Sequence, residues 1–153
     1  MDTQNQQGTF FQRLLRVCTF VIQLLKGPGM VKMNLDMPEK KFLCKCCGLG
    51  EMNKKFLDRL ATIQFGMQEE LVITSGFRCP HHNKEVGGSP TSKHLLGLAA
   101  DVACTDSHKR HLLVSLAVRN GIRGIGIAKG FVHLDQREGP TVLWTYPITE
   151  NID

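Results

Sequence analysis

One stretch decides the fold of this 153-residue chain: Thr74 to Val102, which reads TSGFRCPHHNKEVGGSPTSKHLLGLAADV. Its second half places His94 ahead of Asp101, with Gly97 between them. This layout predicts a loop that delivers an imidazole, turns at the glycine and enters a buried strand carrying one carboxylate. A lone carboxylate in so apolar a strand is costly to bury without a partner, and a metal ion is one of the few partners that offset this cost.

A third metal ligand is expected from a second segment, 131–135, which reads FVHLD. Because side chains alternate along a strand, His133 and Asp135 should point to the same side of it. Zinc bound by two histidines and one carboxylate, with a fourth position left to water, is the usual catalytic arrangement. We therefore predict a zinc site formed by His94, Asp101 and His133.

The segment that leaves the strand before this site contributes a further candidate, Arg78, which should project from the strand end towards the cleft. The other histidines are not favoured as ligands. His81 and His82 follow Pro80 in an expected loop, whereas His108 and His111 are expected on the solvated face of a helix.

Composition indicates a globular domain large enough to bury a core, with 42% apolar and 22% charged residues. The net charge of +5 favours anionic partners such as nucleic acid, an anionic membrane face or the acidic polymers of a bacterial wall. A single Trp, a single Tyr and the lack of a Lys/Arg-rich stripe count against nucleic acid, which we do not expect as a partner.

Hydrophobic periodicity predicts an α+β fold in which a small, mainly antiparallel sheet packs against two or three helices. The expected helices span 9–26, 52–65 and 107–120, and the expected strands span 70–74, 98–103, 122–128, 131–137 and 141–146. The second helix should end near Gly66, and Leu112, Leu113, Leu116 and Ala117 should face the core from the third. Lys129-Gly130 is interpreted as a hairpin turn.

Residues 1–33 are predicted to form an amphipathic helix and a linker ahead of the domain that spans 34–153. The helix lacks the features of a secretory signal, since no Lys or Arg precedes it and Arg16 interrupts its apolar run. It is also too short to span a membrane. It either docks on the domain or makes peripheral membrane contact through residues 10–26. A natural start at Met30 or Met33 is a further alternative.

Six cysteines are present, and three of them, Cys44, Cys46 and Cys47, are clustered. Reduced thiols in a reducing compartment are the favoured interpretation. A disulfide from the cluster to Cys79 is the second. A structural zinc site that adds Cys79 to the cluster is the third, because its spacing differs from the usual pair of CxxC knuckles.

The motifs together resemble the zinc D-alanyl-D-alanine carboxypeptidase and murein endopeptidase family (peptidase M15-like), which shares the fold of the hedgehog signalling domain. They are Ser75-Gly76-Phe77-Arg78, Cys79-Pro80-x-His82-Asn83-x-x-Val86-Gly87-Gly88, Ser92-x-His94-x-x-Gly97-x-Ala99-x-Asp101, and Gly124-x-Gly126 leading to Phe131-Val132-His133-x-Asp135. The resemblance covers about 42–144. It is closest to small cell-wall and phage-type members, which often carry a Cys-rich patch.

By this resemblance, His94, Asp101 and His133 bind one zinc ion per chain, and Arg78 binds a carboxylate or peptide carbonyl of the substrate. The resemblance implies hydrolysis of bonds next to D-amino acids in peptidoglycan stem peptides or cross-links, by a carboxypeptidase or an endopeptidase. It favours the cell envelope or a phage lysis programme as the setting.

One departure from the family pattern concerns the general base. Many members carry Asp or Glu three residues before the final histidine, where this chain has Gly130. Asp135 is the nearest carboxylate that could take protons, but orienting His133 is the favoured role. A non-catalytic, zinc-bearing binding module of the same fold is therefore the alternative function.

Overall fold

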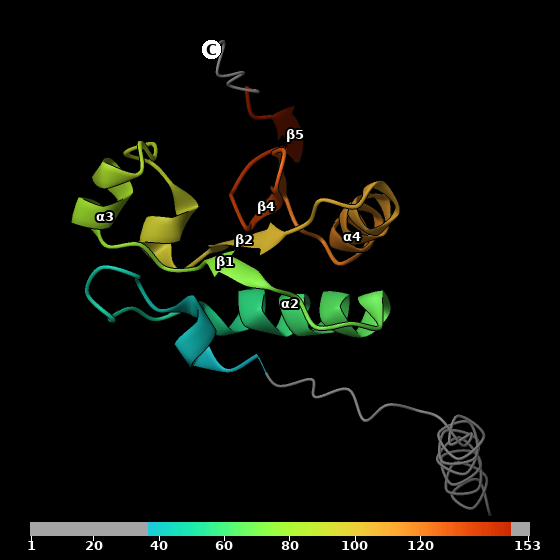
Figure 1. Ribbon diagram of the computed structural model, residues 1–153, viewed down its shortest axis with the longest axis horizontal. Coiled ribbons are helices and arrows are strands. Elements are labelled where there is room, and N and C mark those ends of the chain that lie inside the picture. Colours follow the sequence, from blue (N-terminus) through green and yellow to red (C-terminus); the bar gives the residue numbers. More distant parts are fainter. Residues whose placement is uncertain (1–36, 148–153) are drawn as a thin grey trace, which may run out of the picture. The chain divides into compact units, whose positions relative to one another are not determined.

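The computed structural model describes residues 37–147 and shows an α+β domain, as the sequence predicts (Figure 1). Its elements are, in chain order, η1 (Glu39–Phe42), α2 (Lys54–Met67), β1 (Ile73–Ser75), α3 (Pro80–Glu85), η2 (Lys93–Leu96), β2 (Ala99–Ala103), α4 (Ser107–Arg119), β3 (Gly124–Ile127), β4 (Phe131–Asp135) and β5 (Val142–Thr145). The helix predicted at 9–26 lies outside the described residues. Within them, no helix is long and apolar enough to cross a membrane.

The strands form one five-stranded sheet in the order β1-β2-β4-β3-β5. Every pairing is antiparallel except that of β3 with β5, which is parallel. The central pair is β2 and β4, and their register places Asp101 opposite His133. Residues directly opposite each other on neighbouring antiparallel strands have close Cβ atoms, so the pairing itself brings two predicted ligands together.

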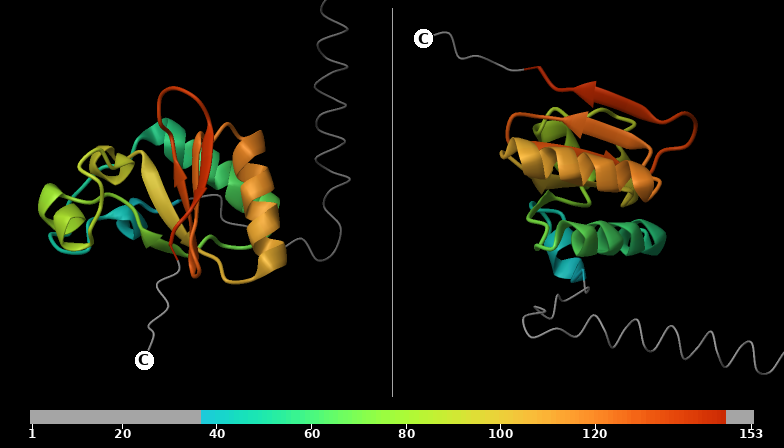
Figure 2. Two further views of the ribbon diagram at one scale, coloured as in Figure 1. Left: turned by 90° about the horizontal axis from the view of Figure 1, so that it is seen from above. Right: turned by 90° about the vertical axis from the view of Figure 1, so that its right-hand side faces the viewer.

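The two faces of the central strands have different roles. Ala100, Val102, Val132 and Leu134 are buried in the hydrophobic core together with side chains of α2 and α4. Figure 2 shows these two helices beside each other on one side of the sheet. Because side chains alternate along a strand, the residues between these apolar positions point to the opposite face, where η2 and α3 lie. The predicted site is therefore on the face that the large helices leave uncovered.

Helix α2 has the expected length but lies two residues later in the chain than 52–65, and it ends one residue after Gly66. Its N-cap is Asn53, whose Oδ1 accepts a hydrogen bond from Phe56 N at 3.2 Å, and its C-cap is Gln68 in the left-handed region (φ 56°). Gly66 lies within it because α4 approaches closely there: an added Cβ would lie 2.7 Å from Leu116 Cδ2. This glycine allows helix packing and does not end the helix.

Helix α4 follows its predicted span, with Asp106 Oδ1 accepting a hydrogen bond from Lys109 N at 2.8 Å as the N-cap. Leu113 and Ala117 are buried, but the side of the helix that carries Leu112 faces outward and this residue is 41% exposed. The prediction that Leu112 faces the core is therefore wrong, since a step of one residue turns a side chain by about 100° around the helix axis.

The short helix α3 replaces the loop that was expected around His81 and His82. Cys79 caps it: its Sγ accepts a hydrogen bond from His82 N at 3.4 Å. Pro80 occupies the first helical position, where a backbone N–H has no partner within the helix, so the lack of this group in proline costs no hydrogen bond. The helix turns the chain back directly after Arg78.

Candidate metal centre and substrate cleft

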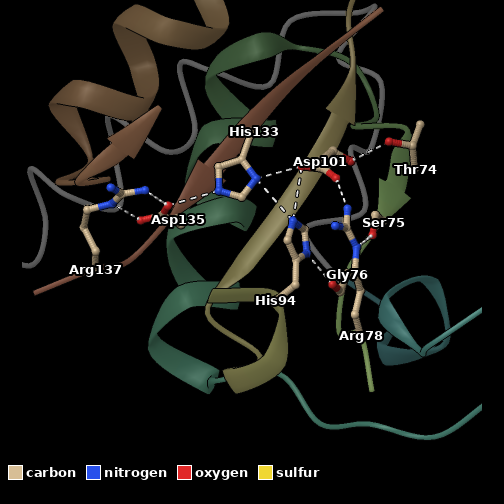
Figure 3. A network of polar contacts seen from close by, with 9 residues as sticks. All are labelled: Thr74, Ser75, Gly76, Arg78, His94, Asp101, His133, Asp135 and Arg137. Atoms are coloured by element: carbon tan, nitrogen blue, oxygen red, sulfur yellow. Dashed lines mark hydrogen bonds and ion pairs between the residues drawn. The ribbon is translucent and has the colours of Figure 1, made fainter. Parts of the chain in front are cut away.

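The three predicted zinc ligands converge at the centre of the sheet, where η2 brings His94 beside the Asp101–His133 pair (Figure 3). His133 Nδ1 lies 2.8 Å from Asp101 Oδ1 and 3.2 Å from His94 Nε2. His94 Nε2 lies 3.3 Å from Asp101 Oδ1. None of the three residues is more than 6% exposed. Three donor atoms from three separate elements thus face one point.

Gly97 fixes the path of the chain from His94 into β2. Its φ of +64° lies in the left-handed region, and an added Cβ would lie 2.1 Å from the carbonyl oxygen of Glu51. Its carbonyl accepts a hydrogen bond from Asn53 N at 2.9 Å, which ties the turn to the start of α2. Only glycine meets both conditions, so the predicted turn has a backbone and a packing cause.

The outer nitrogen of each imidazole is held by an acceptor. His94 Nδ1 donates to the carbonyl oxygen of Gly76 at 2.6 Å, and His133 Nε2 donates to Asp135 Oδ2 at 3.0 Å. Each ring therefore carries its proton on the outer nitrogen, and the lone pairs of His94 Nε2 and His133 Nδ1 face Asp101. Hydrogen bonds of this kind fix the tautomer and the ring orientation of metal-binding histidines.

The donor set fits a zinc ion. Two imidazole lone pairs and a carboxylate oxygen about 3 Å apart repel one another unless a cation lies among them. When no metal is bound, the inward nitrogens can take up a second proton and donate to Asp101. Burial opposes ionisation of Asp101, but these hydrogen bonds from His133 and His94 outweigh it and lower its pKa. Burial also opposes protonation of His133, yet Asp101 and Asp135 outweigh it and raise its pKa. Two histidines and one carboxylate form the donor set of open catalytic zinc sites.

Arg78 neutralises the second oxygen of Asp101. Its Nη2 donates to Asp101 Oδ2 at 2.5 Å, and its Nε donates to Ser75 Oγ at 2.8 Å. The Arg78 side chain is only 15% exposed, but it lines the cleft above the three ligands, as its place after β1 predicts. These two contacts use two of the five N–H donors of a guanidinium, and a ligand in the cleft can bind to the others.

Asp135 is positioned to hold His133. Its Oδ2 accepts from His133 Nε2 and from Arg137 Nη2 at 2.5 Å, and its Oδ1 accepts from Arg137 Nε at 2.9 Å. Burial opposes ionisation of Asp135, but Arg137 and His133 outweigh it and lower its pKa to about 2. So weak a base, with both oxygens engaged, suits orientation of His133 better than proton abstraction. Gly124 makes room for this carboxylate, since an added Cβ would lie 2.2 Å from Asp135 Oδ1.

The donor atoms lie in an open cleft of about 830 Å³ with one aromatic wall. Trp144 and Tyr146, which flank the end of β5, line it, and the Trp144 ring lies 5.4 Å from the His133 ring. The Arg137 guanidinium lies over the Trp144 ring at 4.7 Å from its centre. Neither Trp144 nor Tyr146 was predicted as a site residue, although two-residue alternation along 141–146 places both on the same strand face.

The four other histidines lie away from the three ligands. His81 and His82 are in α3, and the loop predicted for them is wrong. His108 and His111 are exposed on α4, which is consistent with the solvated helix face expected from the sequence.

A family comparison covers the same residues. The sequence model of the Peptidase M15 family matches residues 31–135, a range that contains all three candidate ligands, Arg78 and Asp135. The chain belongs to the Peptidase M15 family. This family assignment implies a metallopeptidase, and the candidate ligand group of this M15 domain is consistent with metal dependence. No curated protein sequence matches the chain.

Proposed function

We propose that this M15 chain is a zinc-dependent peptidoglycan peptidase. It hydrolyses peptide bonds next to D-amino acids in stem peptides or cross-links, as a D-Ala-D-Ala carboxypeptidase or a murein endopeptidase. The observation that carries the proposal is the convergence of two oriented imidazoles on Asp101, beside a partly buried arginine that lines an open cleft.

In this proposal His94, Asp101 and His133 hold the zinc ion. When bound, zinc supplies a Lewis acid for the scissile carbonyl and brings the pKa of water towards about 7. Asp135 keeps the proton of His133 on Nε2, so that Nδ1 stays available as a donor to the metal. The acceptors around the two rings thus prepare the site before any ligand arrives.

Arg78 is proposed to bind the substrate. Ser75 and Asp101 restrain its guanidinium, which reduces the conformational entropy lost on binding. Its remaining N–H donors match a terminal carboxylate in a carboxypeptidase reaction, or a carbonyl oxygen as negative charge develops on it. Lys93 and Arg137 also line the cleft and add positive charge for a stem peptide that carries carboxylates.

The alternative function is a zinc-bearing binding module without catalysis, and two observations favour it. Gly130 is exposed and has no side chain where many family members carry a carboxylate. Asp135 is fully engaged by His133 and Arg137. Glu138 is the exposed carboxylate among the cleft-lining residues, and replacing it with Gln tests whether the chain uses it for proton transfer.

Synthetic stem peptides that differ only in the stereochemistry of the last two residues test the proposal. The zinc-loaded chain should cleave peptides or cross-links with D-configured residues at the scissile bond and leave the L-configured diastereomers intact. A His94→Ala variant, which loses a ligand, should cleave neither. Preferential cleavage of the L-configured peptides would contradict the proposed substrate class. Tight binding of the D-configured peptides without cleavage, with zinc bound, would establish the binding module instead.

A further inference from the structure

A second group of potential metal ligands lies outside the cleft. Cys44, Cys46 and Cys47 come from the loop after η1, and Cys79 is the N-cap of α3. Their four Sγ atoms all lie within 4.8 Å of one another. Cys44 Sγ is 3.6 Å from Cys46 Sγ, which is 3.3 Å from Cys79 Sγ. Within residues 37–147 all four are free thiols, and none of them lines the cleft.

The backbone of the first loop holds three of these sulfurs together. Cys44 N donates to the carbonyl of Leu49 at 2.9 Å, and Gly48 N donates back to the carbonyl of Cys44 at 2.8 Å. Gly48 has a φ of +68°, which a glycine adopts without steric cost. The chain therefore closes a tight turn between Cys44 and Gly48, and this turn carries Cys46 and Cys47.

Backbone N–H groups point at the sulfurs, as expected where thiolates are to be stabilised. Cys79 N donates to Cys44 Sγ at 3.4 Å, and His82 N donates to Cys79 Sγ at the same distance, 3.4 Å. These contacts fix the positions of the Cys44 and Cys79 sulfurs relative to the backbone of both segments.

A zinc ion suits the spacing of the four sulfurs. Zinc–sulfur bonds of about 2.3 Å in a tetrahedron place the sulfurs about 3.8 Å apart. The separations of 3.3 and 3.6 Å, with all sulfurs within 4.8 Å, are close to that arrangement. A disulfide instead needs sulfurs about 2.05 Å apart, and it would pair only two of the four. Thiol protons leave as the ligands bind.

We propose that Cys44, Cys46, Cys47 and Cys79 bind a structural zinc ion, separate from the site at His94, Asp101 and His133. Four thiolates leave no open position, which is typical of a structural site. The ion would join the loop after η1 to the start of α3, next to Arg78. A neighbouring backbone bond, from Phe77 N to the carbonyl of Phe42 at 2.8 Å, joins the same two segments. This proposal does not depend on the proposed peptidase function.

The test measures metal in a variant that lacks the other site. The full chain with His94→Ala and Asp101→Ala, purified with zinc and a non-thiol reductant, is analysed for zinc and iron by mass spectrometry. We expect it to retain one equivalent of zinc. Replacing zinc with Co²⁺ should give thiolate-to-cobalt charge-transfer absorption, which a site of imidazoles and a carboxylate does not produce.

Single cysteine replacements then assign the ligands. Adding Cys46→Ser or Cys47→Ser to the double variant should remove the zinc ion and the charge-transfer bands. Both positions are exposed, so neither replacement alters the hydrophobic core. Cys104→Ser replaces a free buried cysteine outside the cluster and should retain both.

Three results would overturn the proposal. The first is a double variant without zinc, the second is iron in place of zinc, and the third is a zinc content unchanged by Cys46→Ser and Cys47→Ser. A wild-type chain with a single zinc ion that the His94 and Asp101 replacements remove would reject this cluster and leave the proposed peptidase site intact. A wild-type chain with a single zinc ion that the double variant retains would support this cluster and argue against the site at His94, Asp101 and His133.

Discussion

Replacing Asp135 with Asn distinguishes a residue that orients His133 from a general base. The side chain keeps its shape but loses its charge and one of its two acceptor oxygens, so it can no longer accept all the hydrogen bonds that His133 and Arg137 donate to Asp135. If the amide nitrogen faces His133, the ring must accept at Nε2, and its proton moves to the inward nitrogen Nδ1. A protonated Nδ1 cannot bind a metal, so the replacement should weaken zinc binding directly.

The expected size follows from comparable contacts to metal-binding histidines. Loss of such a partner typically lowers metal affinity about 10–100-fold, which corresponds to about 1.4–2.7 kcal/mol. Competition with a chromophoric zinc chelator measures the affinity, and turnover is then measured at saturating zinc. Glu138→Gln is the matched control because Glu138 is an exposed cleft carboxylate, and it should leave zinc affinity unchanged. An unchanged zinc affinity with turnover reduced about 10²–10⁴-fold would refute the orienting role and identify Asp135 as the base.

Three further predictions follow from the same contacts. Arg78→Ala should retain zinc but lower kcat/KM about 10²–10³-fold, and an unchanged kcat/KM would remove Arg78 from the substrate site. In urea titrations Gly97→Ala should lower the free energy of unfolding more than Gly87→Ala does. Both glycines have positive φ, but an added Cβ contacts another atom only at Gly97, where it meets the carbonyl oxygen of Glu51. Equal losses would argue against this packing constraint. Asp101 has a lowered pKa in the folded metal-free protein, so its contribution to the free energy of unfolding is complete above the ordinary carboxyl pKa of about 3.9 and is lost as the pH falls below that value. The stability of the metal-free Asp101→Asn variant should therefore fall less on acidification than that of the metal-free wild type. Equal losses of stability would contradict the lowered pKa.

The sequence was sufficient to predict which candidate residues the fold brings together. Alternation along 131–135 placed His133 and Asp135 on one strand face, and the structure shows them hydrogen-bonded to each other. The glycine between His94 and Asp101 indicated a turn, and its positive φ and close contact with Glu51 provide the cause. Local spacing and strand alternation are strong signals because they depend on few residues and on backbone geometry alone.

Features that depend on tertiary contacts were missed or wrong. The end of α2 near Gly66 could be predicted, but the close approach of Leu116 to this glycine could not. Helix α3 has a cysteine as its N-cap, which is weaker evidence for a helix start than Ser or Asp. The pairing of Asp135 with Arg137 and the wall formed by Trp144 depend on rotamers and on the parallel pairing of β3 with β5, which hydrophobic periodicity does not specify.

The most direct test of the central claim is a digest of purified muropeptides by the zinc-loaded chain, with and without a zinc chelator, followed by mass spectrometry. The proposed function predicts loss of a terminal D-Ala or conversion of cross-linked dimers to monomers, blocked by the chelator and restored by added zinc. Unchanged muropeptides, with zinc still bound by His94, Asp101 and His133, would contradict it and favour the non-catalytic binding module.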